Sequence, residues 1–171
     1  MANKFNNKFV YYDRRLNKVL DYRPLGALGR DPDIVKFDSI LEFKVYLTLR
    51  EYISDEFIHL HRSVLLKPKT VYSSAIRYIA DFQIIAPNLN CYVEAKGVLT
   101  PTAKLKFQAM ELLKPEIRKL TIIVSEKRQS YFGVAYPQSL NLADLRAYLA
   151  TNAQYVDKHG ITRKNTLVKS S

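Results

Sequence analysis

The segment Tyr78–Gly97, YIADFQIIAPNLNCYVEAKG, decides how this chain is interpreted. It contains two apolar runs typical of buried strands, and the stretch APNLN between them is the candidate for a turn. Three of its twenty side chains are charged, namely Asp81, Glu94 and Lys96. The segment predicts a hairpin of two buried strands. The presence of three charged side chains in such strands has to be explained.

Strand geometry indicates whether the three charged groups meet. Successive residues of a strand point to opposite faces of the sheet, so Ala80 and Phe82 are expected on one face and Asp81 on the other. In the second run, Glu94 and Lys96 share a face. If the turn has an even number of residues, all three charged side chains project from one face. A two-residue turn sets Asp81 opposite Glu94, and a four-residue turn sets it opposite Lys96.

Two interpretations of this patch remain open. Adjacent carboxylates repel each other, and a divalent cation relieves that repulsion best. Hard oxygen ligands, to which the Ala95 carbonyl could be added, favour magnesium or manganese over zinc. The alternative is a solvent-facing ion pair between Lys96 and one carboxylate, worth at most about 1 kcal/mol.

The arrangement resembles the signature of the PD-(D/E)XK nuclease superfamily. That signature is an acidic residue ending one strand, a variable gap, and then acid-any-lysine in the neighbouring strand. Here it reads Asp81, then Glu94-Ala95-Lys96, with Ala80 where the family often has proline. The likeness is strongest to small phage or mobile-element endonucleases, including Holliday-junction resolvases and the end-cutting subunits of heteromeric transposases.

The resemblance implies a restriction-endonuclease-like α/β fold. Its core would be αβββαβ, with a mixed central sheet flanked by helices, and the likeness covers roughly residues 38–126. The expected division of the chain is a basic N-terminal hairpin and connector at 1–37, the nuclease core at 38–151, and a basic C-terminal tail at 152–171.

The resemblance also implies roles for four side chains. Asp81 and Glu94 would bind Mg²⁺, for which Mn²⁺ would substitute, and Lys96 would orient the attacking water or neutralise the growing charge on the phosphorane. Glu42, on the helix before the strands, would bind a second metal ion or a water held by it. The alternative for Glu42 is a capping box, Ser39-x-x-Glu42, in which the carboxylate only reaches back to the helix start.

Apolar periodicity predicts the elements that such a core needs. The first helix begins at Ser39, and the second has Thr100 as N-cap with Pro101 in the first helical position. The expected ranges are a hairpin at 9–22, a connector at 23–33, helices at 39–53, 100–114 and 141–152, strands at 57–66, 76–85, 90–97 and 119–126, and a loose tail after 153.

The net charge of +11 and a pI near 9.7 point to a polyanionic partner, DNA, although solubility alone would also explain them. The candidate DNA contacts are Lys104, Lys106 and Gln108 on the second helix, and Arg14 and Arg15 in the N-terminal hairpin loop. The alternatives are a solvated helix face and a packed hairpin.

Several other classes of protein are disfavoured. The single cysteine, Cys91, allows neither an intramolecular disulfide nor a cysteine zinc cluster, and His59-x-His61 lacks a third ligand at a diagnostic spacing. The sequence has no phosphate-binding glycine loop, so no nucleotide cofactor is expected. It also has no run of about 18 apolar residues, and a cytoplasmic location in a bacterial or phage-infected host cell is expected.

The sequence therefore predicts a metal-dependent DNA endonuclease that hydrolyses phosphodiester bonds and leaves a 5′-phosphate and a 3′-hydroxyl. A homodimer is expected, because cutting both strands of a duplex takes two sites. Sequence-specific, junction-specific and transposon-end substrates all remain open. The competing class is a catalytically silent nuclease-fold protein that acts as a DNA-binding or structural module.

Overall fold

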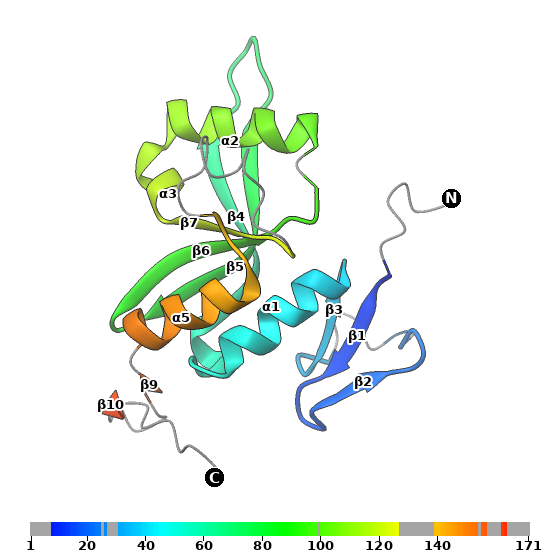
Figure 1. Cartoon of the computed structure of the whole chain (residues 1–171). Coiled ribbons are helices and arrows are strands. Elements are labelled where there is room, and N and C mark those ends of the chain that lie inside the picture. Colours follow the sequence, from blue (N-terminus) through cyan, green and yellow to red (C-terminus); the bar gives the residue numbers. More distant parts are fainter. Residues whose placement is uncertain are drawn as a thin grey trace. The chain divides into compact units, whose positions relative to one another are not determined.

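A computed structural model of the chain describes residues 8–24, 26, 31–98, 100–126, 139–153, 155–156 and 162–163. The chain divides into two compact units, Met1–Tyr46 and Leu47–Ser171. The boundary falls inside helix α1 (Ile40–Arg50), whose Leu41, Val45 and Leu49 are buried as the predicted apolar stripe requires. Figure 1 shows the elements of both units.

The first unit contains a three-stranded antiparallel sheet in the order β2-β1-β3. Strands β1 (Val10–Asp13) and β2 (Lys18–Leu20) confirm the predicted hairpin. Strand β3 (Ile34–Phe37) was not predicted; it pairs with the other edge of β1. Its four residues follow a stretch rich in proline and glycine, and their pairing partner lies more than twenty residues earlier. No local pattern signals such a contact.

The N-terminal hairpin is closed by side-chain contacts and packed by aromatic rings. Asp13 Oδ1 accepts a hydrogen bond from the Leu16 N–H at 2.9 Å. The ring of Tyr12 lies 5.2 Å from that of Phe43 and 6.0 Å from that of Tyr46. Because Tyr12 is buried in this cluster, it supports the packed-hairpin interpretation and has no free ring face for stacking.

The second unit is built on a mixed five-stranded sheet in the order β4-β5-β6-β7-β8. The first three strands are antiparallel, and β7 and β8 are parallel to β6. The bounds are η1 (Asp55–Phe57, a 3₁₀ turn), β4 (Ile58–Lys67), β5 (Ile76–Ala86), β6 (Leu89–Ala95), β7 (Thr121–Val124) and β8 (Ser139–Leu140). The predicted order of helix, three strands, helix and strand is confirmed, and β8 is an addition.

Helices cover both faces of this sheet (Figure 1). On one face lie α2 (Pro101–Leu113) and the short α3 (Pro115–Lys119), and on the other lies α5 (Leu142–Asn152). The Thr100 side chain accepts from the Ala103 N–H at 3.2 Å, which confirms the predicted cap. The core beneath α2 consists of Leu66, Tyr78, Ala80, Tyr92, Phe107, Met110 and Ile123.

The expectation of a loose tail is wrong for part of that segment. Tyr155–Val156 (β9) pairs antiparallel with Thr162–Arg163 (β10), and a two-residue pairing of this kind has too short a pattern to be recognised in sequence. The remainder of the tail lies outside the described residues. No helix in the part of the chain that the structure describes is long and apolar enough to cross a bilayer.

The thiol of Cys91 provides a test of the packing of β6. The side chain is buried, and burial raises its pKa from about 9 to about 12. We expect a thiol reagent at pH 8 to modify the native protein far more slowly than the urea-unfolded chain. Fast modification of the native protein would contradict this packing.

The same shift has a consequence for stability. Between pH 9 and 12 the native state keeps the Cys91 proton that the unfolded state loses, so stability falls as pH rises through this range. Urea unfolding of wild type and Cys91→Ala at several pH values should show a shallower decline in the variant.

Candidate functional site

The turn between β5 and β6 sets the register of the signature residues. Ala86 pairs with Leu89, so the turn has two residues, and the even-length expectation is confirmed in its shorter form. The ladder continues to Phe82 opposite Val93. The ladder ends at that pair, and one further step in this register would set Asp81 opposite Glu94.

The three charged groups of the signature lie together at this point of the sheet. Asp81 Oδ2 accepts a hydrogen bond from the Ala95 N–H at 2.7 Å. Glu94 Oε1 forms an ion pair with Lys96 Nζ. The Glu94 side chain is 6% exposed and that of Lys96 is 27% exposed, so the pair extends from the interior toward solvent.

Tyr78 holds the second oxygen of the glutamate. Its hydroxyl donates to Glu94 Oε2 at 2.9 Å. Burial raises the pKa of Tyr78 well above its ordinary value, and the charge of Glu94, the hydrogen bond to it and the charge of Asp81 raise it further, whereas Arg118 on α3 lowers it. Tyr78 therefore remains a protonated donor in the ordinary pH range.

Strand β5 changes face near Asp81, which corrects part of the parity prediction. Phe82 pairs with Val93, but Ala80 packs in the same cluster as Tyr92, the residue next to Val93. Since neighbouring residues of β6 point to opposite faces, Ala80 and Phe82 lie on different faces, where regular alternation had predicted the same one. This change brings Tyr78 to the side of the sheet where Glu94 lies.

The adjacent strand β4 is irregular at the same level. The ladder pairs Leu60 with Phe82 and Arg62 with Ala80. Between them, His61 has a φ of 49°, in the left-handed region that residues other than glycine seldom adopt. Departures of this kind often lie beside functional sites, where they redirect a side chain. The irregular residue in β4 thus lies across from the face change in β5.

Tyr78, Arg118 and His61 were not predicted as parts of the site. Tyr78 lies in an apolar run, and this context predicts a core residue. Arg118 lies in a five-residue helix without a recognisable pattern, and its side chain is buried although it is charged. The burial of a charged arginine near the acid-x-lysine motif indicates that Arg118 belongs to the site. This burial can be recognised in the structure but not in the sequence.

Glu42 belongs to the first compact unit, where it caps helix α1. Its N–H donates to Ser39 Oγ at 3.0 Å, and its Oε2 accepts from the Asp38 N–H at 2.8 Å. The capping interpretation is therefore observed, with the carboxylate reaching the residue before the cap. A metal-binding role for Glu42 stays a prediction.

The predicted DNA contacts differ in how free their side chains are. Lys104, Lys106 and Gln108 are all exposed on α2. Arg14 Nη2 donates to the Pro32 carbonyl at 2.8 Å, so this guanidinium fixes the connector. Arg15 is 65% exposed and lies 3.9 Å from Asp13. The helix residues and Arg15 have the exposure that a phosphate contact requires.

The donor set at β5 and β6 is compatible with magnesium. No group of three or more His, Cys, Asp or Glu side chains placed to hold a metal occurs among the residues described. Magnesium, however, is commonly bound by one or two carboxylates together with waters and substrate phosphates. Asp81 and Glu94 supply the two carboxylates of such a donor set.

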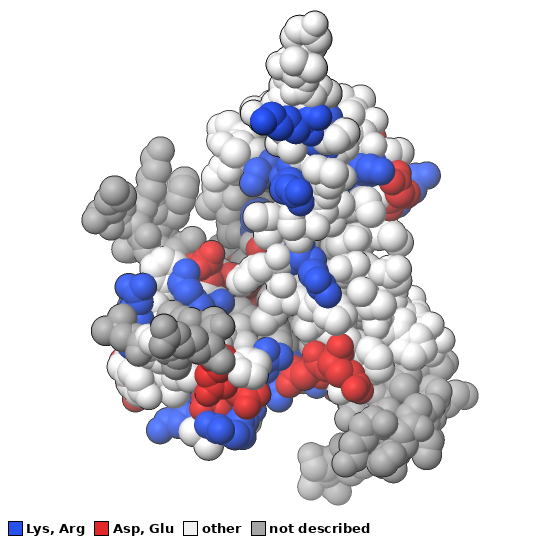
Figure 2. Space-filling model, turned by 180° about the vertical axis from the view of Figure 1, so that it is seen from behind, with Lys and Arg blue, Asp and Glu red and all other residues white. Residues whose placement is uncertain are grey.

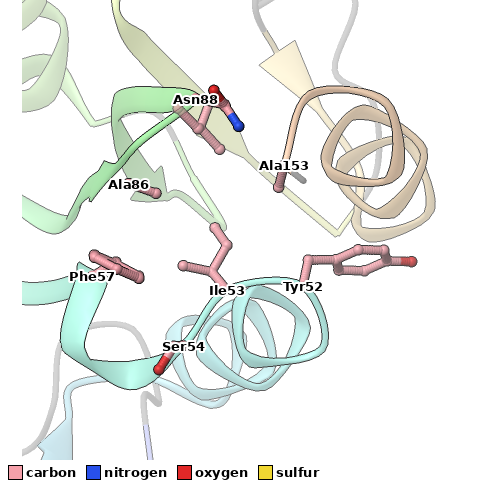
Figure 3. A pocket seen from close by; sticks show the side chains of 8 residues that line it. Tyr52, Ile53, Ser54, Phe57, Ala86, Asn88 and Ala153 are labelled. Carbon is pink, nitrogen blue, oxygen red and sulfur yellow. The ribbon is translucent and has the colours of Figure 1, made fainter. Parts of the chain in front are cut away.

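A small pocket elsewhere in the second unit is not a candidate site (Figure 3). Its volume of about 10 Å³ is room for roughly one water molecule. Its lining carries no acidic, basic or thiol side chain and consists of Tyr52, Ile53, Ser54, Phe57, Ala86, Asn88, Leu89 and Ala153.

Comparison of the chain with protein-family models, with curated proteins and with solved structures finds no match. The assignment of the site rests on its own residues and geometry.

The contact between Tyr78 and Glu94 can be tested by stability. Tyr78→Phe removes the hydroxyl and leaves a buried carboxylate oxygen without this donor, which should lower the free energy of unfolding by about 1–3 kcal/mol. Tyr72→Phe is the matched control, because Tyr72 is 97% exposed. Equal urea midpoints for the two variants would contradict the hydrogen bond.

Proposed function

We propose that this chain is a metal-dependent endodeoxyribonuclease of the PD-(D/E)XK type. The observation that carries the proposal is the meeting of Asp81, Glu94 and Lys96 on two paired strands, with the lysine ion-paired to the buried glutamate. A surface ion pair would not need a carboxylate buried to this degree. Burying a charge is costly unless the buried group has a task or compensating partners.

The architecture supports the same proposal. The signature residues lie on β5 and at the end of β6, which follow helix α1 and precede helix α2 in the sequence, in a mixed sheet with helices on both faces. This order is the αβββαβ order that the resemblance implies. The restriction-endonuclease-like fold is accordingly part of the proposal.

The proposed mechanism assigns a task to each side chain. Asp81 and Glu94 would hold Mg²⁺ or Mn²⁺, which would supply neutralisation of phosphate charge and activation of a water. Lys96 orients that water and stabilises the negative charge that develops on the phosphorane. Tyr78 keeps Glu94 in one orientation by its hydrogen bond, and Ala95 does the same for Asp81.

Charge supports DNA as the substrate. The chain carries 27 basic and 16 acidic residues, which favours binding to a phosphate backbone. The exposed Lys104, Lys106 and Gln108 of α2 are proposed contacts. A homodimer is proposed for cutting both strands, with one site for each strand.

Nicking of a supercoiled plasmid tests the activity. Wild type should nick with Mg²⁺ or Mn²⁺ and stop in EDTA. Asp81→Ala should lose activity but retain DNA affinity, because it removes a metal ligand and a negative charge that faces phosphate. Glu116→Ala, which changes an exposed acidic residue of α3, is the matched control and should nick like wild type.

The outcomes of this assay separate the two classes of function. A fully active Asp81→Ala protein would overturn the site assignment. A wild type that binds DNA but cuts neither duplex, four-way junction nor flap with either metal would instead favour the catalytically silent binding module. Relative rates on junction and linear duplex would identify the substrate class.

The lysine is the most discriminating residue of the site. Lys96→Met should lower the single-turnover cleavage rate on the order of 10²- to 10⁴-fold at saturating protein, because the developing charge loses its stabilising cation. Lys119→Met, at an exposed position of α3, makes the same charge change and should leave the rate unaltered. Thermal unfolding of both variants controls for folding. A near-normal rate in folded Lys96→Met would remove the main support for the family resemblance.

A further inference from the structure

The hairpin formed by β4 and β5 extends beyond the core and ends in two exposed apolar side chains. Val71 is 96% exposed and Tyr72 is 97% exposed. Figure 1 shows this hairpin projecting past α2. Among the described residues of this unit, none covers these two side chains.

The tip is nevertheless ordered by hydrogen bonds. Thr70 and Ser73 form an isolated antiparallel bridge, with N···O distances of 2.9 and 3.4 Å. Their hydroxyl oxygens lie 2.9 Å apart, and the Tyr72 N–H donates to Thr70 Oγ1 at 3.3 Å. The turn therefore holds Val71 and Tyr72 at its apex in a defined conformation, which lowers the entropic cost of binding through them.

The base of the hairpin is anchored on one face and open on the other. Tyr78, Ala80 and Leu66 pack in the core with Phe107 and Met110 of α2. The opposite face carries the cross-strand pairs Ser63–Ile79 and Leu65–Arg77, and all four of these residues are exposed. The hairpin is thus a rigid ribbon with a free face and a free tip.

The charge on this ribbon has one sign. The sequence from Phe57 to Ala80 contains no aspartate or glutamate, and its four basic residues are Arg62, Lys67, Lys69 and Arg77. Figure 2 shows lysine and arginine side chains gathered below the projecting uncharged tip. Basic side chains along the hairpin complement a polyanion, and the apolar tip complements apolar groups that lie between the charges of that polyanion.

We propose that the β4–β5 hairpin enters a groove of duplex DNA, with Lys67, Lys69 and Arg77 on the phosphates and Tyr72 against the bases. A two-stranded ribbon has a width that the major groove admits, and aromatic side chains contact base edges there, the thymine methyl group among them. Tyr72 precedes Asp81 by nine residues, so the tip lies roughly 25–30 Å along the strand from the site, within about one helical turn of DNA. In its link to cleavage, this inference rests on the proposed nuclease function.

A binding assay in EDTA tests the hairpin without cleavage. It uses the full-length protein, a fluorescein-labelled 30-bp duplex and a series of salt concentrations. The test variants are Tyr72→Ala and the double variant Lys67→Ala/Lys69→Ala. Their matched controls are Leu112→Ala, at an 83% exposed leucine of α2, and Lys114→Ala/Lys119→Ala in and before α3.

Two effects are expected. Tyr72→Ala should weaken binding by about 5- to 100-fold with an unchanged salt slope, since it removes a contact with base edges and no charge. The Lys67/Lys69 double variant should lower the slope of log K against log salt by up to about 1.8, since two phosphate contacts are lost. Both controls should leave affinity and slope unchanged.

Wild-type affinity and slope in both test variants would overturn the proposal. So would a wild type that binds phosphatidylserine vesicles and no duplex, which would make the tip a membrane contact. If the test variants lose binding while wild type nicks no DNA, the hairpin proposal stands and the nuclease proposal fails. If wild type nicks with Mg²⁺ and the variants bind normally, the nuclease proposal stands and the hairpin proposal fails.

Discussion

The burial of the Glu94 carboxylate is the constraint on which the rest of the site depends. A carboxylate removed from water loses several kilocalories per mole of solvation unless hydrogen bonds and an opposite charge replace it. Here Tyr78 and Lys96 supply these, one to each oxygen. Both partners are needed on the same side of the sheet as Glu94. The departure of β5 from regular alternation near Asp81 places Tyr78 on that side, and β4 is irregular across from it at His61.

The neighbouring carboxylate is placed by a different kind of contact. Asp81 Oδ2 accepts a hydrogen bond from the backbone N–H of Ala95, so the path of β6 contributes to its position. The tight two-residue turn after Ala86 sets that path. The acid pair is therefore fixed by backbone geometry on one member and by side-chain partners on the other.

Features that depend on local chemistry were predictable. The Thr100 cap and the Pro101 start of α2 both follow from preferences of single residues for particular backbone positions. The proximity of Asp81 and Glu94 was predicted from strand parity on the condition of an even turn, although the parity itself fails between Ala80 and Phe82. Features that depend on distant partners were missed. Strand β3 is defined by its pairing with β1, and Tyr78 looks like a core residue until the face change turns its hydroxyl to Glu94.

The change from antiparallel to parallel pairing at β6 bears on the order in which the chain folds. The β4–β5–β6 meander needs only short loops, so its contacts close over small sequence separations. Pairing of β6 with β7 requires that α2 and α3 first form the crossover connection between them. Across it, the backbone N–H of Lys96 donates to the Val124 carbonyl, and that of Tyr92 donates to the Leu120 carbonyl. Long-range parallel pairing of this kind is the slower process. Asp81, Glu94 and Tyr78 thus lie in the early, local part of the topology, while Arg118 joins them only when the crossover has formed.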